Sequence, residues 1–288
     1  MINVFMLMRT HQYVKNFFIF LPLFFALKFT DKDLLLSTIV AFVAFSLLAS
    51  AVYILNDYHD IEEDRLHPRK KNRPLASGAI SKAQAILIMA LLLVTGLTIM
   101  IMLSPLATGV LIFYVTMNVA YSFYLKHIAI VDISIIALGF VLRLFVGSVV
   151  TGIHLSGWIV IMTFLLALFL ALAKRRDDLL IYLNTGKKMR KVINGYNIQF
   201  LDTAMAIMAT VVIVAYTNYT LSPEVIARVN NEYLYLTSFF VILGIMRYLK
   251  LTFVLKSSGS PTRIILRDAF TQITLLGWVV SFIFILYY

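Results

Sequence analysis

Acidic side chains with helical spacing stand beside a run of bases just after an apolar segment. The 23 residues 56–78 contain five acids and five Lys or Arg residues. Asn56, Asp60 and Asp64 follow one another at intervals of four, so on a continuous helix they share one face. Like charges at this spacing repel each other unless a cation lies between them. The spacing therefore predicts a site for a divalent cation.

The oxygen ligands on offer suit Mg2+, which commonly takes one or two carboxylates together with phosphate oxygens of a substrate. We predict Asn56, Asp60 and Asp64 as metal ligands, with Asp57 on the same helical face as a substrate-binding residue. Asp60 and Asp64 are then catalytic, because their metal ion neutralises a leaving diphosphate. The alternative is a solvated charged loop, which explains the bases but not the phased acids.

Bases follow the acids closely in the sequence. Arg65, Lys71 and Arg73, with Lys70 as the neighbour of Lys71, lie near enough to contact the phosphates of a bound diphosphate. Arg binds phosphate as a two-pronged fork and Lys binds it as a point charge. We therefore predict these four bases as substrate ligands beside the metal ion.

The whole chain has the composition of a membrane protein. It has 288 residues and is 61% hydrophobic, whereas a soluble domain is nearer half apolar. Apolar stretches of about 20 residues recur, each long enough to cross a bilayer core. We predict an all-α polytopic membrane protein, with residues 1–288 forming a single catalytic domain. The nine expected spans are 12–30, 34–56, 82–103, 105–124, 129–151, 157–174, 196–220, 233–255 and 265–287.

The distribution of Lys and Arg predicts the orientation. Apart from Arg143, which falls within an apolar span, only Lys28, Lys32 and Arg228 lie on the side opposite to the other bases. Cytoplasmic loops carry such an excess of bases, which also accounts for the net charge of +11 without a nucleic-acid partner. We expect a protein of the cytoplasmic membrane, with its N-terminus and acidic segment on the cytoplasmic side.

The acidic segment resembles the first aspartate-rich motif of the UbiA prenyltransferase superfamily. The matching residues are Asn56, Asp57, Asp60, Asp64, Arg65, Pro68, Arg73, Pro74, Leu75 and Gly78, with Lys71 one residue later than strict spacing. Nine helices with the motif after the second also agree with that superfamily. The resemblance implies a UbiA-like helical bundle and Mg2+ as the cofactor.

Three other segments are similar to one branch of the superfamily, the decaprenyl-phosphate phosphoribosyltransferases. They are the opening residues 9–16 with Lys15 and Asn16, a stretch from Tyr121 and Lys126 through Asp132 to Arg143 and Gly147, and residues 173–178. We predict that Lys15, Asn16, Tyr121 and Lys126 bind substrate. For Lys15 and Asn16 the alternative is an interfacial anchor. Tyr121 and Lys126 depart by one residue from the spacing of many prenyltransferases.

The third of these segments separates the branch from its relatives. Prenyltransferases that use a prenyl diphosphate usually carry a second D-x-x-x-D after the sixth span, and this chain has Lys174 and Arg175 there, followed by Asp177 and Asp178. Bases can neutralise a lipid monophosphate or a sugar 5-phosphate without metal. We predict Lys174 and Arg175 as substrate ligands; anchoring by the positive-inside bias is the alternative.

Arg143 lies midway along an apolar span, where a charge costs about 2.5–3.5 kcal/mol or more. Either a phosphate or an internal acid must balance it, and Asp132 stands earlier on the same expected helix. We predict that Arg143, together with Lys15, binds substrate and acts in catalysis. Pairing with an acid is the alternative. Arg267 and Asp268, at the start of the last span, are further candidates for closing the site.

The resemblance implies transfer of 5-phosphoribose from phosphoribosyl diphosphate to a polyprenyl phosphate, with release of diphosphate. In better-known members of the branch this product feeds cell-wall polymers. One alternative is a UbiA-type enzyme that prenylates an aromatic or other small acceptor, against which the missing second acidic motif argues. Another is a transporter of anions, although transporters tend to place charges at the membrane midplane and here most charge lies in one cluster. The sequence does not indicate an oligomeric state.

Overall fold

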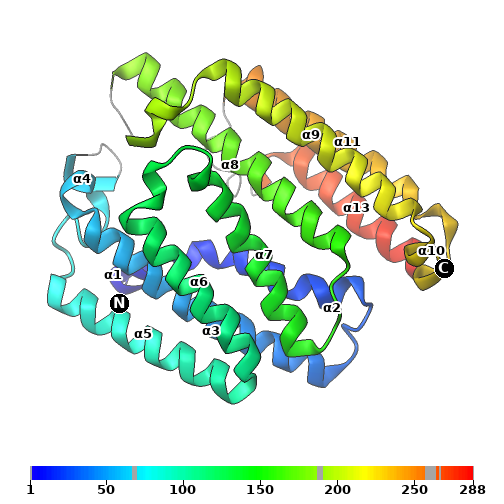
Figure 1. Ribbon diagram of the computed structural model, residues 1–288, viewed down its shortest axis with the longest axis horizontal. Helices are drawn as coiled ribbons and strands as arrows, with labels where there is room; N and C mark the ends of the chain where they lie inside the picture. The colour runs from blue at the N-terminus through cyan, green and yellow to red at the C-terminus, as the bar shows by residue number, and fades with distance from the viewer. Residues whose placement is uncertain (1, 67–69, 187–190, 257–263, 266, 288) are drawn as a thin grey trace. The chain divides into compact units, whose positions relative to one another are not determined.

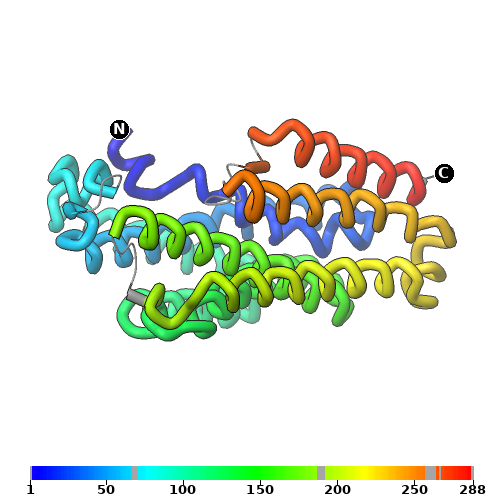
Figure 2. The backbone as a smooth tube through the Cα atoms, turned by 90° about the horizontal axis from the view of Figure 1, so that it is seen from above, coloured from blue at the N-terminus to red at the C-terminus, as the bar shows by residue number. Residues whose placement is uncertain are grey.

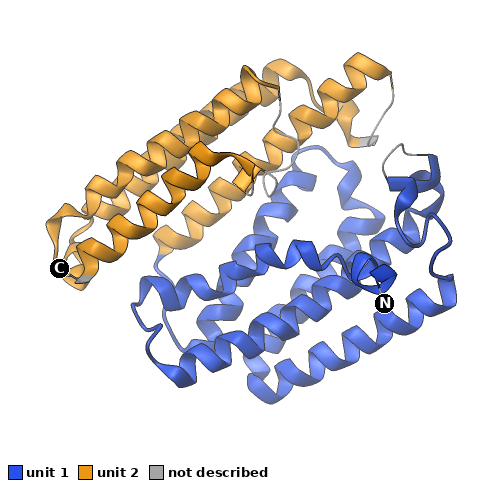
Figure 3. Cartoon of the chain, turned by 180° about the vertical axis from the view of Figure 1, so that it is seen from behind, with its two compact units in different colours: residues 1–156 blue, residues 157–288 orange. Residues whose placement is uncertain are grey.

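The computed structural model describes residues 2–66, 70–186, 191–256, 264–265 and 267–287. Pro68 of the motif lies outside the described residues, as do Arg69, Lys187, Lys188, Arg190 and Arg263 among the bases. The chain divides into two compact units, residues 1–156 and 157–288, which Figure 3 draws in blue and orange. That residues 1–288 act as one catalytic domain stays a prediction.

The first unit is a set of helices around α3 (Figure 1). Its elements are α1 (Ile2–Met8), the 3-10 helix η1 (Thr10–Phe20), α2 (Leu21–Phe25), α3 (Lys32–His59), α4 (Ile61–Leu66), η2 (Lys70–Asn72), α5 (Lys82–Leu103), α6 (Pro105–Phe123), η3 (Leu125–His127) and α7 (Val131–Thr151). The long helix α3 packs against η1, α5, α6 and α7.

The regular elements described in the second unit are also helices. They are α8 (Gly157–Thr185), η4 (Lys191–Gly195), α9 (Ile198–Leu221), α10 (Pro223–Val229), η5 (Glu232–Thr237), α11 (Ser238–Phe253) and α13 (Ala269–Tyr287). Figure 2 shows α11 between α9 and α13. The all-α prediction is confirmed, because every regular element in the described residues is a helix.

Eight helices of the described part are long and apolar enough to cross a membrane. They are α3, α5, α6, α7, α8, α9, α13 and the segment Glu232–Phe253. This agrees closely with the nine spans predicted. The predicted first span, 12–30, is instead η1 followed by the short helix α2. Pro22 falls in the first turn of α2, whereas one helix over 12–30 would place it in the interior, where proline breaks the hydrogen bonding.

Local capping explains why several boundaries agree with the sequence. The Asp31 carboxylate accepts hydrogen bonds from the first amides of α3, at Asp33 and Leu34. The Ser81 hydroxyl accepts from the amide of Gln84, and the Gln84 side chain accepts from the amide of Ser81, which starts α5. Such caps satisfy amides that have no partner within the helix, so they fix its first residue.

Helix continues past the predicted ends of two membrane spans. The loop expected at 175–195 is helical as far as Thr185, because α8 continues past the predicted end of its span. The Arg176 side chain accounts for part of this extension. Its Nε lies 2.5 Å from Asp202 Oδ1 of α9, and its Nη1 donates to the carbonyl of Thr252 at 3.0 Å. In the loop expected at 57–81, the end of α3 and all of α4 are helical.

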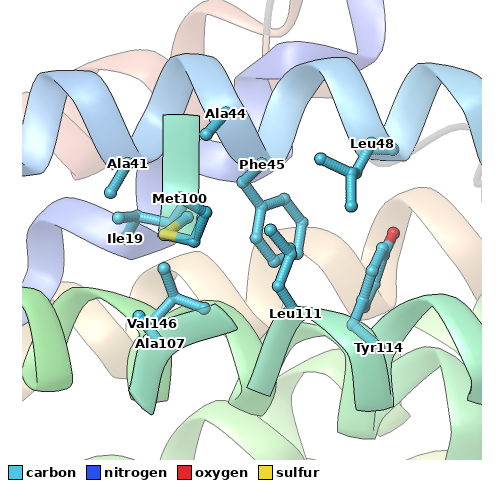
Figure 4. Packing of buried hydrophobic residues seen from close by; sticks show 11 residues of the cluster. Ile19, Ala41, Ala44, Phe45, Leu48, Met100, Ala107, Leu111, Tyr114 and Val146 are labelled. Atoms are coloured by element: carbon cyan, nitrogen blue, oxygen red, sulfur yellow. The ribbon is translucent and has the colours of Figure 1, made fainter. Parts of the chain in front are cut away.

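The core of the first unit forms where α3 meets its neighbours. Small residues of α3 allow close packing around the Phe45 ring, which faces Leu111 and Tyr114 in Figure 4. The most apolar window of α3 is 61% buried, compared with 17% for α5. Helix α3 is therefore central, and α5 presents most of its apolar side chains outward, as expected of a helix that faces lipid.

Gly147 of α7 makes a close approach to η1. A Cβ atom at this position would lie 2.0 Å from the backbone oxygen of Ile19, which cannot move without moving η1. We expect Gly147→Ala to destabilise the protein by about 1–3 kcal/mol. Thermal unfolding of the purified protein measures this.

Gly109 of α6 provides the matched control, because a Cβ there meets nothing within 4 Å. Gly109→Ala should leave the unfolding temperature unchanged or raise it, since alanine favours helix more than glycine does. Equal unfolding temperatures for Gly147→Ala and the wild type would contradict the close packing of η1 on α7.

Candidate active site at the end of α3

The acidic segment begins in the last turn of α3 and continues through a break at Asp60 into α4. The Asp60 amide donates to the carbonyl of Asn56 at 3.0 Å, and the Asp64 amide donates to that of Asp60 at 2.8 Å. Helical hydrogen bonding therefore persists across the break. Asn56, Asp57, Asp60 and Asp64 are consequently held by regular backbone, as the sequence predicted.

The four polar residues of this segment form two pairs. Asn56 Nδ2 donates to Asp60 Oδ2 at 3.1 Å. Arg73 Nη1 donates to both Asp57 Oδ1, at 3.0 Å, and Asp64 Oδ2, at 2.6 Å. Within the described residues, no three acidic or histidine side chains lie close enough to share one metal ion. The assignment of Asn56, Asp60 and Asp64 to one Mg2+ thus stays a prediction.

Asp64 is the residue of this group that best fits a cation. Its side chain is buried, and its Oδ1 has no hydrogen-bond partner among the described residues. Lys70 Nζ lies 3.7 Å from this oxygen, beyond hydrogen-bonding distance. Buried polar atoms without a partner are rare, and a carboxylate oxygen beside phosphates is a preferred ligand of Mg2+. The donor set at Asp64 therefore fits the metal ion that the motif implies.

Asp57 holds two arginines from distant parts of the chain. The carboxylate is 2% exposed and binds Arg9 as well as Arg73. The Arg9 guanidinium also lies 5.3 Å above the Tyr53 ring, and Arg9 has a left-handed backbone with φ of 52°. The sequence prediction did not include Arg9 in the site. In the sequence, Arg9 was notable only as the first residue of the opening segment 9–16, and its position there did not indicate that it contacts Asp57.

Lys126 is brought to Asp60 from η3. Its Nζ lies 2.6 Å from Asp60 Oδ1, and His59 Nδ1 lies 3.0 Å from the same oxygen. Burial on its own would raise the pKa of Asp60, but the hydrogen bonds from Lys126 and His59 outweigh burial and hold this pKa below its ordinary value. Asp60 is therefore a carboxylate at neutral pH, as a metal ligand must be.

The remaining predicted residues of the first unit are less closely involved. Arg65 donates to Glu62 at 3.1 Å and to the carbonyl of Ala76 at 3.3 Å, so it connects α4 to the loop before α5. Lys71 is exposed on η2, and Tyr121 is half-buried in the last turn of α6. Their predicted contacts with substrate stay predictions.

Arg143 is buried among neutral groups. It is 4% exposed, and its Nε donates to Asn16 Oδ1 at 2.8 Å. Its other partners are the Gly139 carbonyl at 2.5 Å, the Tyr114 hydroxyl at 3.3 Å, and the rings of Phe45, Tyr114 and Phe140. No described acid forms an ion pair with Arg143, so the alternative of pairing with Asp132 is not what the structure shows.

Lys15 and Asn16 come from η1, next to each other. Asn16 is fully enclosed, and Lys15 is half-buried. Because Asn16 binds Arg143, its chain neighbour Lys15 adds a second basic residue to this part of the first unit. No described acid forms an ion pair with either of them, and the hydrogen-bond acceptors of Arg143 are neutral.

Lys174 and Arg175 lie on α8 in the second unit, whose residues are described separately from those above. Arg175 is buried and its Nη1 donates to Asp178 Oδ2 at 3.1 Å, while Lys174 is half-buried. Whether they contact the same substrate as the acidic segment stays a prediction.

Asp268 has a structural role that the sequence prediction did not foresee. Arg247 donates to both of its oxygens, at 2.5 and 3.1 Å, and the Thr271 amide donates to it at 2.9 Å. The hydrogen bonds from Arg247 in the first place, and then those from Thr271, hold the pKa of Asp268 well below its usual range. The residue thus caps the start of α13, and its predicted part in closing the site stays a prediction.

Comparison with known proteins identifies the family of the chain. The sequence profile of the UbiA prenyltransferase family matches residues 17–286. The chain belongs to this family. Among solved UbiA proteins, the structure is similar to a homologue from Archaeoglobus fulgidus bound to GPP and Mg2+, with a TM-score of 0.72 at 18% identity and 99% of each chain covered. That likeness confirms the UbiA-like helical bundle.

Among UbiA sequences, the chain is similar to members of one branch. The decaprenyl-phosphate phosphoribosyltransferase of Mycolicibacterium smegmatis is 31% identical over 94% of this chain and 88% of its own length. The enzyme of the same name from Corynebacterium glutamicum is 28% identical over 89% of this chain and 78% of its own length. The resemblance to this branch is confirmed. This UbiA protein is an integral membrane transferase related to enzymes that act on prenyl phosphates.

Proposed function

We propose that this UbiA protein transfers 5-phosphoribose from phosphoribosyl diphosphate to a polyprenyl phosphate. The observation that carries the proposal is the 31% identity with the decaprenyl-phosphate phosphoribosyltransferase of M. smegmatis over nearly the whole chain. The bases Lys174 and Arg175, at the place where diphosphate-prenyl enzymes have a second acidic motif, support it.

The reaction needs little acid–base chemistry from the protein. A phosphate oxygen of the lipid attacks the anomeric carbon of the ribose, and the bond from that carbon to the diphosphate breaks as the diphosphate leaves with the electron pair. A phosphate monoester is already anionic near pH 7, so no strong general base is required. The task of the protein is to hold two anionic substrates together and to neutralise the charge that develops on the leaving group.

Asp60 and Asp64 are proposed to hold Mg2+ with Asn56. When bound, Mg2+ supplies positive charge to the leaving diphosphate. The Asp64 Oδ1 atom, which lacks a hydrogen-bond partner among described residues, is the oxygen most open to such a role. Arg73 bridges Asp57 and Asp64, and so fixes the direction in which Asp64 presents this oxygen.

The proposed binding residues supply the charge that the substrates require. Arg143 and Lys15, the latter next to Asn16 in the chain, have no ion pair with a described acid, and such bases suit a phosphate. The positive-inside distribution of Lys and Arg supports placing this site at the cytoplasmic face of the cytoplasmic membrane. A soluble donor reaches that face from the cytoplasm and a lipid acceptor reaches it from the bilayer. The product would be a lipid-linked phosphoribose for the synthesis of cell-wall polymers.

A second candidate is transfer of a prenyl group from a prenyl diphosphate to a small acceptor. The observation in its favour is that the structurally similar A. fulgidus homologue was solved with GPP and Mg2+, and in another case with DMAPP and Mg2+. Both candidates use the first acidic motif, so they differ only in the donor and the acceptor.

Radiolabelled donors separate the two functions. Purified protein in vesicles that contain polyprenyl phosphate receives either labelled phosphoribosyl diphosphate or labelled prenyl diphosphate with a small aromatic acceptor, each with and without Mg2+. We expect Mg2+-dependent entry of the phosphoribosyl label into the lipid phase. The Asp64→Asn variant in the same vesicles provides the background. Transfer of the prenyl label alone would overturn the proposal.

A further inference from the structure

The 3-10 helix η1 packs against the α-helix α3, and residues three apart on η1 bind residues four apart on α3. Tyr13 Oη lies 2.9 Å from Ser50 Oγ, and Asn16 Nδ2 donates to Ser46 Oγ at 2.8 Å. Three residues of a 3-10 helix rise about 6 Å, and four residues of an α-helix rise the same distance. A spacing of three on η1 therefore matches a spacing of four on α3. Increasing numbers on η1 meet decreasing numbers on α3, so the two helices are antiparallel.

This match explains why η1 keeps 3-10 geometry over eleven residues, longer than such helices usually run. In a 3-10 helix, side chains three residues apart align on one face. Tyr13, Asn16 and Ile19 share that face, and Ile19 meets Gly147 of α7. In an α-helix, Tyr13 and Asn16 would still share a face, but they would be only about 4.5 Å apart along the axis and would match the spacing of the two serines less well.

Asn16 connects this contact to Arg143. Its side chain is 1% exposed, and both ends of its amide are bound within the protein. Nδ2 donates to Ser46, and Oδ1 accepts from Arg143 Nε at 2.8 Å. Because a guanidinium has only donors, the amide oxygen must face Arg143. A buried amide held at both ends is poorly placed to bind a substrate itself.

A neutral partner leaves the charge of Arg143 in place. A carboxylate at position 16 would hold the guanidinium equally well but would cancel its charge. The described contacts of Arg143 use three of its five N–H groups, and all of the acceptors are neutral. The guanidinium is thus fixed in direction while it keeps its full charge and two donors.

We propose that Asn16, held by its hydrogen bond to Ser46, is a positioning residue that orients Arg143 toward an anionic substrate. The proposal rests on the proposed function in one respect, that Arg143 acts on a phosphate-bearing substrate. It revises the sequence prediction that Asn16 binds substrate directly.

A double-mutant cycle distinguishes positioning from direct contact. We expect Asn16→Leu to lower kcat/KM by about tenfold, the usual order for losing a hydrogen bond to a charged group. In an Arg143→Gln background, Asn16→Leu should have little further effect, because the residue that it positions is gone. Effects that multiply in the double variant would mean that Asn16 acts on the substrate independently, and would overturn the proposal.

Asn16→Asp tests the role of charge. The fold should remain, since a carboxylate can accept from Arg143, so the unfolding temperature should stay at or above that of the wild type. KM for the anionic substrates should rise by about tenfold, because an ion pair now neutralises Arg143. A merely structural Asn16 would leave KM unchanged, and this result would also overturn the proposal.

Ser46→Ala tests the hydrogen bond by which Ser46 holds the Asn16 amide. Ser46→Ala should lower kcat/KM by less than Asn16→Leu does, and Ser46→Thr, which restores a hydroxyl, should recover the wild-type value. Thr38→Val is the matched control on α3, because the buried Thr38 hydroxyl donates to the carbonyl of Leu34 in its own helix. All variants are assayed with whichever labelled donor the wild type uses. If that donor is a prenyl diphosphate, the proposed function fails while the cycle still tests Asn16.

Discussion

Asp64→Asn should lower turnover by about 10²–10³-fold or more while the protein remains folded, because the site then binds Mg2+ less well and loses the positive charge that neutralises the leaving diphosphate. The buried carboxylate has one oxygen on Arg73 and one with no hydrogen-bond partner among the described residues. An amide keeps its shape but loses its charge, and amides bind Mg2+ less well than carboxylates do. Turnover of the labelled donor, measured over a range of Mg2+ concentrations, gives the loss.

Asp60→Asn should have a comparable effect through a different contact. Asp60 binds Lys126 and Asn56, so the substitution removes the negative charge from the pair that Asp60 forms with Asn56. Glu62→Gln is the matched control, because Glu62 lies between these residues in sequence but is 78% exposed and, among the described residues, pairs with Arg65. We expect its turnover to equal that of the wild type. Near-normal turnover in both Asp variants, with unfolding temperatures unchanged, would contradict the metal assignment.

Arg143→Met should separate activity from stability. We expect kcat/KM to fall by about a hundredfold, since a cation facing developing negative charge is lost. The free energy of unfolding should change by no more than about 2 kcal/mol, because removing a charge from an apolar span offsets the lost hydrogen bonds to Asn16 and Tyr114. Steady-state kinetics and thermal unfolding of the same preparation give both quantities.

Arg176→Met is the contrasting variant. Arg176 is also buried, but it has the acidic partner Asp202 and donates to the backbone of α11. Removing it leaves Asp202 without this partner, so the unfolding temperature should fall clearly. If Arg143→Met were as active as the wild type, Arg143 would be a structural residue like Arg176, and the proposed phosphate site beside Asn16 would be lost.

Much of the fold could be predicted because it depends on local sequence. The spans at α5, α6 and α7 were predicted to within two residues at each end, since apolar length and capping residues such as Ser81 and Ser104 act over one or two turns. The acidic motif was found for the same reason. Its residues lie within three turns of helix, so their spacing alone shows that they belong together.

Contacts between distant segments could not be predicted in this way. Arg9 meets Asp57, and Asn16 meets Arg143, across separations of 48 and 127 residues. The register of η1 on α3 depends on Ser46 and Ser50 of α3, which lie outside residues 10–20. The grouping of the acids into two pairs likewise depends on Arg73 and Lys126, which approach from outside the motif.

The sequence by itself determined that this chain is an all-helical membrane transferase of the UbiA family with a phased acidic segment, because periodicity, apolar length and short motifs are properties of neighbouring residues. Only the tertiary structure decided which charges neutralise one another. It gave Asp57 two arginines and Asp60 a lysine, and it left Arg143 with neutral partners. Charges interact through space over a few ångströms, so their effect on one another depends on packing and not on distance along the chain.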